Sequence, residues 1–125
     1  LLAGGKSMGG RMTSLAAAEE PLPGVRGIVF LGFPLHAPEN PSTERANHLR
    51  DVDVPMLFLQ GTRDKLADLK LLKPVIRKLG KLATLHVVEG ADHSFHVPRS
   101  LGKSDDVVLD HLSEIMSRWI SRIMT

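Results

Sequence analysis

Short apolar runs alternate with polar, glycine-rich segments along the chain. Residues 27–32 and 56–60 are apolar on both faces, which is typical of strands buried inside a parallel sheet. A third strand is expected at residues 84–88, and the apolar stub at residues 1–3 resembles the end of a further strand. The pattern therefore predicts three strands and part of a fourth.

Three segments between and after these strands have the spacing of helices. We expect helices over residues 8–20, 66–79 and 105–124, with Ser104 capping the last and Gly80 ending the second. The apolar face expected of the first helix is made of Met12, Leu15 and Ala16. The apolar stripe of the last helix is made of Val108, Leu112, Ile115, Trp119 and Ile123.

The order of these elements predicts an α/β fold, with helices packed on a mostly parallel sheet. Residues 33–47 are expected to form a proline-bearing polar loop between two strands. In such sheets ligands bind beyond the carboxyl ends of the strands. Ser7, Asp64 and His93 all follow strand ends in the sequence, so we expect them on one edge of the sheet.

Composition narrows the function classes without choosing among them. The 125 residues are 42% hydrophobic and 24% charged, as in an ordinary globular domain, and the length suits one core. The absence of cysteine excludes disulfides and thiolate metal sites. A net charge of +2 is too small to indicate nucleic-acid binding, and no apolar run is long enough to cross a membrane. A cytoplasmic protein with neither a nucleic-acid nor a membrane partner is therefore expected.

The segment between the strand stub and the first helix matches the pattern G-x-S-x-G. Gly5 and Gly9 flank Ser7 at the two positions where small residues let a strand and a helix pass closely, and Gly10 adds clearance. A serine on such a turn lies at a helix N-terminus, where free N–H groups favour developing negative charge. We expect the backbone N–H of Met8 to be one donor to an oxyanion.

A serine nucleophile needs a base and an acid that orients the base. Asp64 follows the strand at residues 56–60, and His93 follows the strand at residues 84–88, in the chain order Ser, Asp, His that is typical of α/β hydrolases. Asp68 and His96 are nearby rivals for the acid and the base, while Asp64 lies closer to its strand end.

Four sequence blocks together resemble one group of α/β hydrolases. They are GKSMGGRM at residues 5–12, GFPLHAP at 32–38, LQGTRD at 59–64 and GADHSF at 90–95. The chain is similar over residues 1–120 to the dienelactone-hydrolase-like group, which is related to testis-expressed and chromatin-complex-subunit hydrolase-like domains. The resemblance implies an α/β-hydrolase fold with Ser7 as nucleophile, Asp64 as acid and His93 as base. It implies no particular substrate.

The same resemblance implies that the chain is part of a larger domain. An α/β-hydrolase sheet has eight strands, and residues 1–125 would correspond to its C-terminal part, from the end of strand 5 through strand 8. The loop that supplies the second oxyanion donor would then lie outside the chain. We accordingly expect the isolated 125 residues to be inactive and poorly folded, with an unpaired apolar strand edge.

These observations predict a serine hydrolase that acts on an ester, thioester or similar acyl bond of a small molecule, through an acyl-enzyme and without a cofactor. One alternative is a non-enzymatic interaction module with a vestigial triad, as the chromatin-complex relatives suggest. A second alternative reads Lys6 and Ser7 as the end of a phosphate-binding loop. The pair of glycines that follows Met8 would weaken the helix that such a loop needs.

Other polar residues have weaker functional signals. His93 and His96 lack a third ligand at a recognisable spacing, so no metal site is predicted there. His36 fits a substrate pocket and a solvated loop equally well, and Arg11 and Arg63 are expected on the surface rather than on an anionic substrate. A basic run is interpreted as a solvated helix face. It comprises Lys65, Lys70, Lys73, Arg77, Lys78 and Lys81.

Overall fold

A sheet of four parallel strands forms the centre of the molecule, in the order β1-β2-β3-β4. The computed structural model describes all residues, 1–125. The strands are β1 (Ala3–Lys6), β2 (Ile28–Leu31), β3 (Met56–Gly61) and β4 (Ala83–Val88). Each strand therefore pairs with its neighbour in sequence, and the loops at the carboxyl ends lie along one edge of the sheet.

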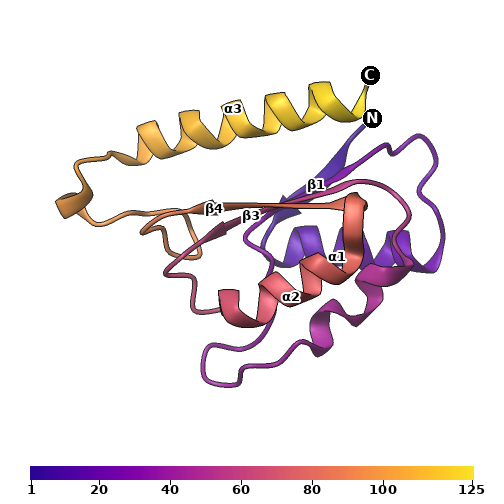
Figure 1. Cartoon of the computed structure of the whole chain (residues 1–125), viewed down its shortest axis with the longest axis horizontal. Helices are drawn as coiled ribbons and strands as arrows, with labels where there is room; N and C mark the ends of the chain where they lie inside the picture. Colours follow the sequence, from indigo (N-terminus) through magenta and orange to yellow (C-terminus); the bar gives the residue numbers. More distant parts are fainter.

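Helices cover both faces of the sheet (Figure 1). On one face lie α1 (Met8–Glu19), α2 (Leu69–Leu79) and the 3-10 segment η1 (Glu44–Asp51), while α3 (Asp105–Ile123) crosses the other face alone. The short 3-10 turns η2 (Gly80–Leu82) and η3 (Arg99–Leu101) lead into β4 and towards α3. No helix is both long and apolar enough to cross a membrane. The α/β architecture predicted from the sequence is thus present.

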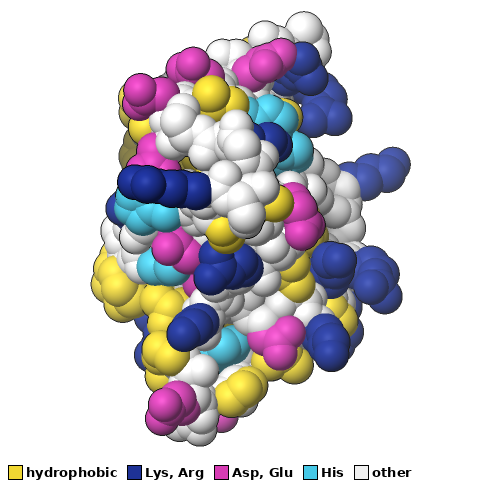
Figure 2. Space-filling view, turned by 90° about the vertical axis from the view of Figure 1, so that its left-hand side faces the viewer, with side chains coloured by type: hydrophobic (Ala, Val, Ile, Leu, Met, Phe, Trp, Pro, Cys, Tyr) yellow, Lys and Arg dark blue, Asp and Glu magenta, His cyan; other side chains and the backbone are white.

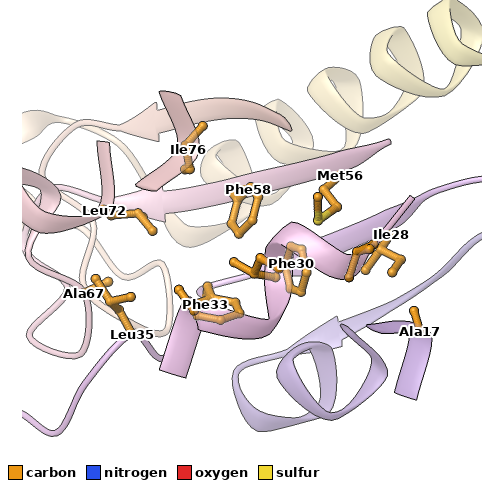
Figure 3. Close-up of a cluster of buried hydrophobic side chains, with 13 residues drawn as sticks. Ala17, Ile28, Phe30, Phe33, Leu35, Met56, Phe58, Ala67, Leu72 and Ile76 are labelled. Carbon is orange, nitrogen blue, oxygen red and sulfur yellow. The ribbon is translucent and has the colours of Figure 1, made fainter. Parts of the chain in front are cut away.

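The strands bury both faces because their side chains alternate between two separate apolar clusters. On the α1 and α2 side, the ring of Phe30 stacks on Phe58 with 4.5 Å between centroids and meets Phe33 edge-on at 5.2 Å (Figure 3). On the α3 side, Leu57 and Leu59 belong to the cluster that contains Trp119. This alternation explains why β2 and β3 read as continuous apolar runs.

The face that α1 buries differs from the predicted one. Its buried residues are Gly10, Ser14 and Ala17, whereas Met12 is 47% exposed. The prediction was wrong because residue size, not hydrophobicity, determines which residues of α1 face the sheet. A helix that leaves β1 through a one-residue turn lies too close to the sheet for large side chains, so it presents small residues there.

The remaining elements follow the prediction with two changes. Ser104 caps α3 by accepting a hydrogen bond from the Val107 N–H, and Gly80 ends α2 with φ 69°. Helix α2 begins later than expected, because Asp68 caps it by accepting from the Lys70 N–H. The expected loop at residues 33–47 runs into η1, whose polar sequence lacks a helical apolar stripe.

Candidate functional site

Ser7 occupies the single-residue turn between β1 and α1. Its backbone has φ 54° and ψ −122°, a conformation that is strained for a residue with a Cβ. Its N–H donates to the Leu31 carbonyl at 2.9 Å, so the end of β2 fixes the turn. Met8 is the first residue of α1, and its N–H belongs to the first turn, which has no partners within the helix.

The close approach of β1 and α1 depends on Gly5 and Gly10. A Cβ on Gly5 would lie 2.8 Å from the Gly10 nitrogen, and a Cβ on Gly10 would lie 2.7 Å from the Gly5 carbonyl oxygen. A Cβ on Gly9 would meet no atom within 4 Å. The steric role expected of Gly9 therefore falls on Gly10, because Gly10 is the residue of α1 that faces the strand.

Ser7, His93 and Asp64 meet at the carboxyl edge of the sheet. His93 Nε2 lies 2.7 Å from Ser7 Oγ, and His93 Nδ1 lies 2.8 Å from Asp64 Oδ2. Nδ1 must carry a proton to bond a carboxylate, which leaves Nε2 free to accept from the serine hydroxyl. The Asp64 side chain is fully buried, while His93 keeps 22% of its side chain exposed. The arrangement can move a proton from the serine to the imidazole.

Two further groups hold the Asp64 carboxylate. Oδ1 accepts from the Leu66 N–H at 2.8 Å, and Oδ2 lies 3.4 Å from Gln60 Nε2. The side-chain oxygen of Gln60 accepts from the Phe33 N–H, so this buried side-chain amide joins the loop after β2 to Asp64. Sequence reasoning missed Gln60, although a lone amide at the end of a buried apolar strand was a usable signal.

The loop that carries His93 is built around the Asp92 carboxylate. Asp92 Oδ1 accepts from the N–H groups of Ser94 and His96 at 2.9 and 3.0 Å. Phe95 adopts φ 63° and is buried in the cluster beneath α3, which anchors the loop to the core. The imidazole is thereby held by the backbone of its own loop as well as by its two side-chain partners.

The acid loop and the base loop are also joined to each other. The Arg63 N–H donates to the Ala91 carbonyl at 2.9 Å, and the Gly90 N–H donates to Thr62 Oγ1 at 2.7 Å. The backbones approach so closely that a Cβ on Gly61 would lie 2.1 Å from the Ala91 oxygen. The glycine at the end of β3 is therefore needed for the spacing between Asp64 and His93.

Asp68 and His96, the rival candidates for the acid and the base, make contacts outside the site. Asp68 is exposed and caps α2, and His96 is exposed and pairs with Asp105 at 2.9 Å. Neither bonds to the serine or to its histidine partner. Among the candidates from the sequence, the structure brings together Ser7, Asp64 and His93.

His36 is buried, which is at odds with a solvated loop residue, and it lines a hollow that also contains Asp64. It is only 3% exposed, its Nδ1 lies 2.7 Å from the Ala37 carbonyl, and its Nε2 accepts from the Asp68 N–H at 2.9 Å. The ring fastens the loop after β2 to the start of α2. It contributes to the wall of a neighbouring hollow only through the little surface that remains.

The phosphate-loop interpretation is wrong. Gly5 and Lys6 lie within β1 and pair in register with β2, so no loop encloses an anion there. The Ser7 hydroxyl is bonded to a histidine rather than being placed toward a magnesium site. No group of three or more His, Asp or Glu side chains is arranged to hold a metal ion.

Two open hollows border the His–Asp side of the site. One of about 380 Å³ is lined by His93, Arg63, Lys65 and four further residues, and one of about 590 Å³ is lined by eleven residues including Asp64 and His36. Figure 2 faces this end of the molecule, where basic, acidic and histidine side chains are interspersed. Every residue of the predicted basic run is exposed, as a solvated surface requires.

A second polar cluster joins α1 to η1 behind the site. Ser14 Oγ lies 2.7 Å from His48 Nε2, and Arg11 Nε donates to the Arg45 carbonyl at 3.3 Å. Burial and the Arg11 charge lower the pKa of His48, although the Arg45 carbonyl and Asp51 oppose the shift. Burial and the Arg45 charge also lower the pKa of Arg11. Arg11 is thus part of the packing between two elements, not a purely surface residue as expected.

A parallel sheet with helices on both faces, and with serine, histidine and aspartate together at its carboxyl edge, is the arrangement of the α/β hydrolases. Residues 1–121 match the alpha/beta hydrolase domain family. The chain belongs to that family.

Solved structures agree with this assignment of the fold. An alpha-beta serine hydrolase homologue from Coxiella burnetii has a TM-score of 0.65 and 20% identity, over 92% of this chain and 46% of its own. Dienelactone hydrolase from Anabaena variabilis has a TM-score of 0.63 and 23% identity, over 95% of this chain and 47% of its own. The esterase domain of a Rhodothermus marinus protein has a TM-score of 0.70 and 17% identity, over 97% of this chain and 59% of its own. The chain thus spans about half the length of the structures it matches.

Proposed function

We propose that the chain carries the catalytic triad of a serine hydrolase that acts on an ester, thioester or similar acyl bond of a small molecule. The observation that carries the proposal is the continuous hydrogen-bonded series from Ser7 through His93 to Asp64, at 2.7 and 2.8 Å. Such spacing permits proton transfer between nucleophile and base without rearrangement. Membership of the hydrolase family and the resemblance to esterase structures support the same reaction class.

In the proposed acylation step, His93 Nε2 removes the Ser7 proton as Oγ attacks the carbonyl carbon of the substrate. The carbonyl oxygen becomes an oxyanion, which the N–H of Met8 and the N-terminus of α1 stabilise. The tetrahedral intermediate then collapses and its bond to the leaving group breaks. That group departs with the proton from His93, and the acyl group remains on Ser7 as an ester.

Deacylation uses the same residues in reverse. His93 removes a proton from a water molecule, whose oxygen attacks the acyl carbon. The acid product departs, and Ser7 Oγ recovers its proton from the imidazolium. Asp64 keeps Nδ1 protonated and stabilises the imidazolium by its charge throughout, and its burial strengthens that interaction. No step in this sequence requires a cofactor.

Labelling with a fluorophosphonate probe tests the nucleophile directly. We expect the probe to label the full-length protein and the Ser7→Ala variant to lose the labelling. Ser94→Ala is the matched control, because Ser94 is an exposed serine in the neighbouring loop whose contact with Asp92 uses only its backbone. Labelling that persists in Ser7→Ala would overturn the proposed nucleophile.

The rival residues provide controls for the other two roles. Asp64→Asn is expected to lower kcat by roughly 10³- to 10⁴-fold, as loss of the orienting carboxylate does in other triads, whereas Asp68→Asn is not. His93→Gln is expected to abolish turnover of a p-nitrophenyl ester, and His96→Gln is expected to retain it. Equal rates of ester hydrolysis in the original protein and in Ser7→Ala would instead favour the non-enzymatic interaction module.

The 125-residue chain should also be assayed alone. Labelling in the full-length protein but not in the chain agrees with a second oxyanion donor from outside these residues. A rate near that of the full-length protein would contradict the expected inactivity of the isolated chain.

A further inference from the structure

Two histidines on the opposite side of the sheet from α1 and α2 form a pair that the proposed reaction does not use. His86 lies in β4 and His111 lies in α3, and their Nε2 atoms are 3.1 Å apart. The ring centroids are 5.1 Å apart and the ring planes are tilted by 52°. Both rings thus turn the same nitrogen towards a common point between a strand and a helix.

The alternation of side chains along β4 explains why these nitrogens meet. His86 points to the same face as Val88, two residues later, and Val88 belongs to the cluster beneath α3. His111 precedes Leu112, which is buried in that cluster. The pair therefore lies at the margin of a packed apolar contact, which fixes the two backbones while one ring stays exposed and the other half-buried.

We propose that His86 and His111 bind a divalent transition-metal ion such as Zn²⁺, with water in the remaining coordination positions. Zinc–imidazole bonds of about 2.0–2.1 Å place two nitrogens about 2.9 to 3.4 Å apart for angles between a right angle and the tetrahedral value. The observed 3.1 Å lies inside that range.

The unprotonated imidazole is the form that binds a metal ion. Two neutral imidazoles whose Nε2 atoms face each other can share one proton in an N–H···N hydrogen bond, or they can accept a metal ion in its place. Borderline ions such as Zn²⁺ and Cu²⁺ prefer imidazole, whereas Mg²⁺ prefers oxygen ligands.

A bound ion would have a structural consequence near the triad. The two histidines are 25 positions apart in sequence, and the segment between them contains His93. A metal bridge would close this segment into a loop and so reduce the freedom of the unfolded chain. The ion would therefore stabilise the contact of α3 with β4 without touching the reacting atoms.

Calorimetric titration of the full chain with ZnSO₄ tests the site, with MgCl₂ as the control ion. We expect one equivalent of zinc to bind, and His86→Gln or His111→Gln each to weaken the affinity at least tenfold. His96→Gln, which changes another exposed histidine, should leave the affinity unaltered. Absence of zinc binding, or an affinity in either pair variant equal to that of the original protein, would overturn the proposal.

A second measurement needs no substitution and so does not depend on how the variants fold. Substoichiometric Cu²⁺ should broaden the ring NMR signals of His86 and His111 before those of His36 and His93 in the unaltered chain. Broadening that begins at His93 or His36 instead would place the ion elsewhere and contradict the proposal.

Discussion

Gln60 Nε2 lies 3.4 Å from Asp64 Oδ2, and the other end of the same buried amide accepts the backbone N–H of Phe33. One side chain from the end of β3 thus satisfies a loop amide and a buried carboxylate at once. These contacts contribute to stability independently of any catalytic role, because a buried N–H without a hydrogen-bond partner destabilises the fold.

Replacing Gln60 with leucine should therefore lower the free energy of unfolding. The Phe33 N–H would lose its acceptor while remaining buried, which costs about 1–3 kcal/mol. Urea denaturation measures the difference, with Thr13→Val as the control because Thr13 bonds only within its own exposed helical turn. Unchanged stability in Gln60→Leu would show that the amide is not needed to satisfy this backbone.

The two adjacent glycines of α1 should respond oppositely to alanine. Gly10→Ala places a Cβ 2.7 Å from the Gly5 oxygen and 3.1 Å from Phe30 Cδ1, and such overpacking costs about 1–3 kcal/mol. Gly9→Ala meets no atom and should be neutral, or stabilising by up to about 1 kcal/mol through helix propensity. Thermal unfolding of the two variants checks the ordering, and a larger loss in Gly9→Ala would contradict it.

Removal of the Asp92 carboxylate should disturb the loop of His93. Asp92→Ala loses two hydrogen bonds to loop amides, while Asp92→Asn keeps an oxygen acceptor. If the proposed chemistry is correct, Asp92→Ala should slow probe labelling of Ser7 by roughly tenfold or more, because small misplacements of a catalytic group cost up to about 100-fold. Labelling rates that are equal in the alanine and asparagine variants would argue against this role.

Stability should fall when the pH drops below the ordinary histidine pKa. The folded-state pKa values of His48 and His86 are lowered, chiefly by burial, so the unfolded chain binds more protons between the folded and unfolded values. The free energy of unfolding therefore rises with pH up to about 6.5, the ordinary histidine pKa. Below that pH it declines until the folded-state pKa values are passed. His48→Gln should flatten the dependence, and urea denaturation at pH 5 and pH 7.5 measures it.

The local pattern of the sequence was sufficient to predict the main helices and strands. It was also sufficient to predict that three polar residues lie on one edge of the sheet. Parallel strands whose carboxyl ends share an edge bring Ser7, Asp64 and His93 near each other by topology alone. The continuous apolar runs of β2 and β3 also indicate burial on both faces, and the apolar stripe of α3 indicates the face that it buries, because period and hydrophobicity are local properties.

Only the tertiary structure decided the contacts that depend on distance between segments. The small face of α1, the interior place of His36, and the link from Gln60 to Asp64 all follow from how closely separate elements approach. The meeting of His86 with His111 has the same origin, since nothing in either local pattern refers to the other. Hydrophobic periodicity encodes the side of an element that is buried, whereas the partner of a polar side chain is set by packing across the whole sheet.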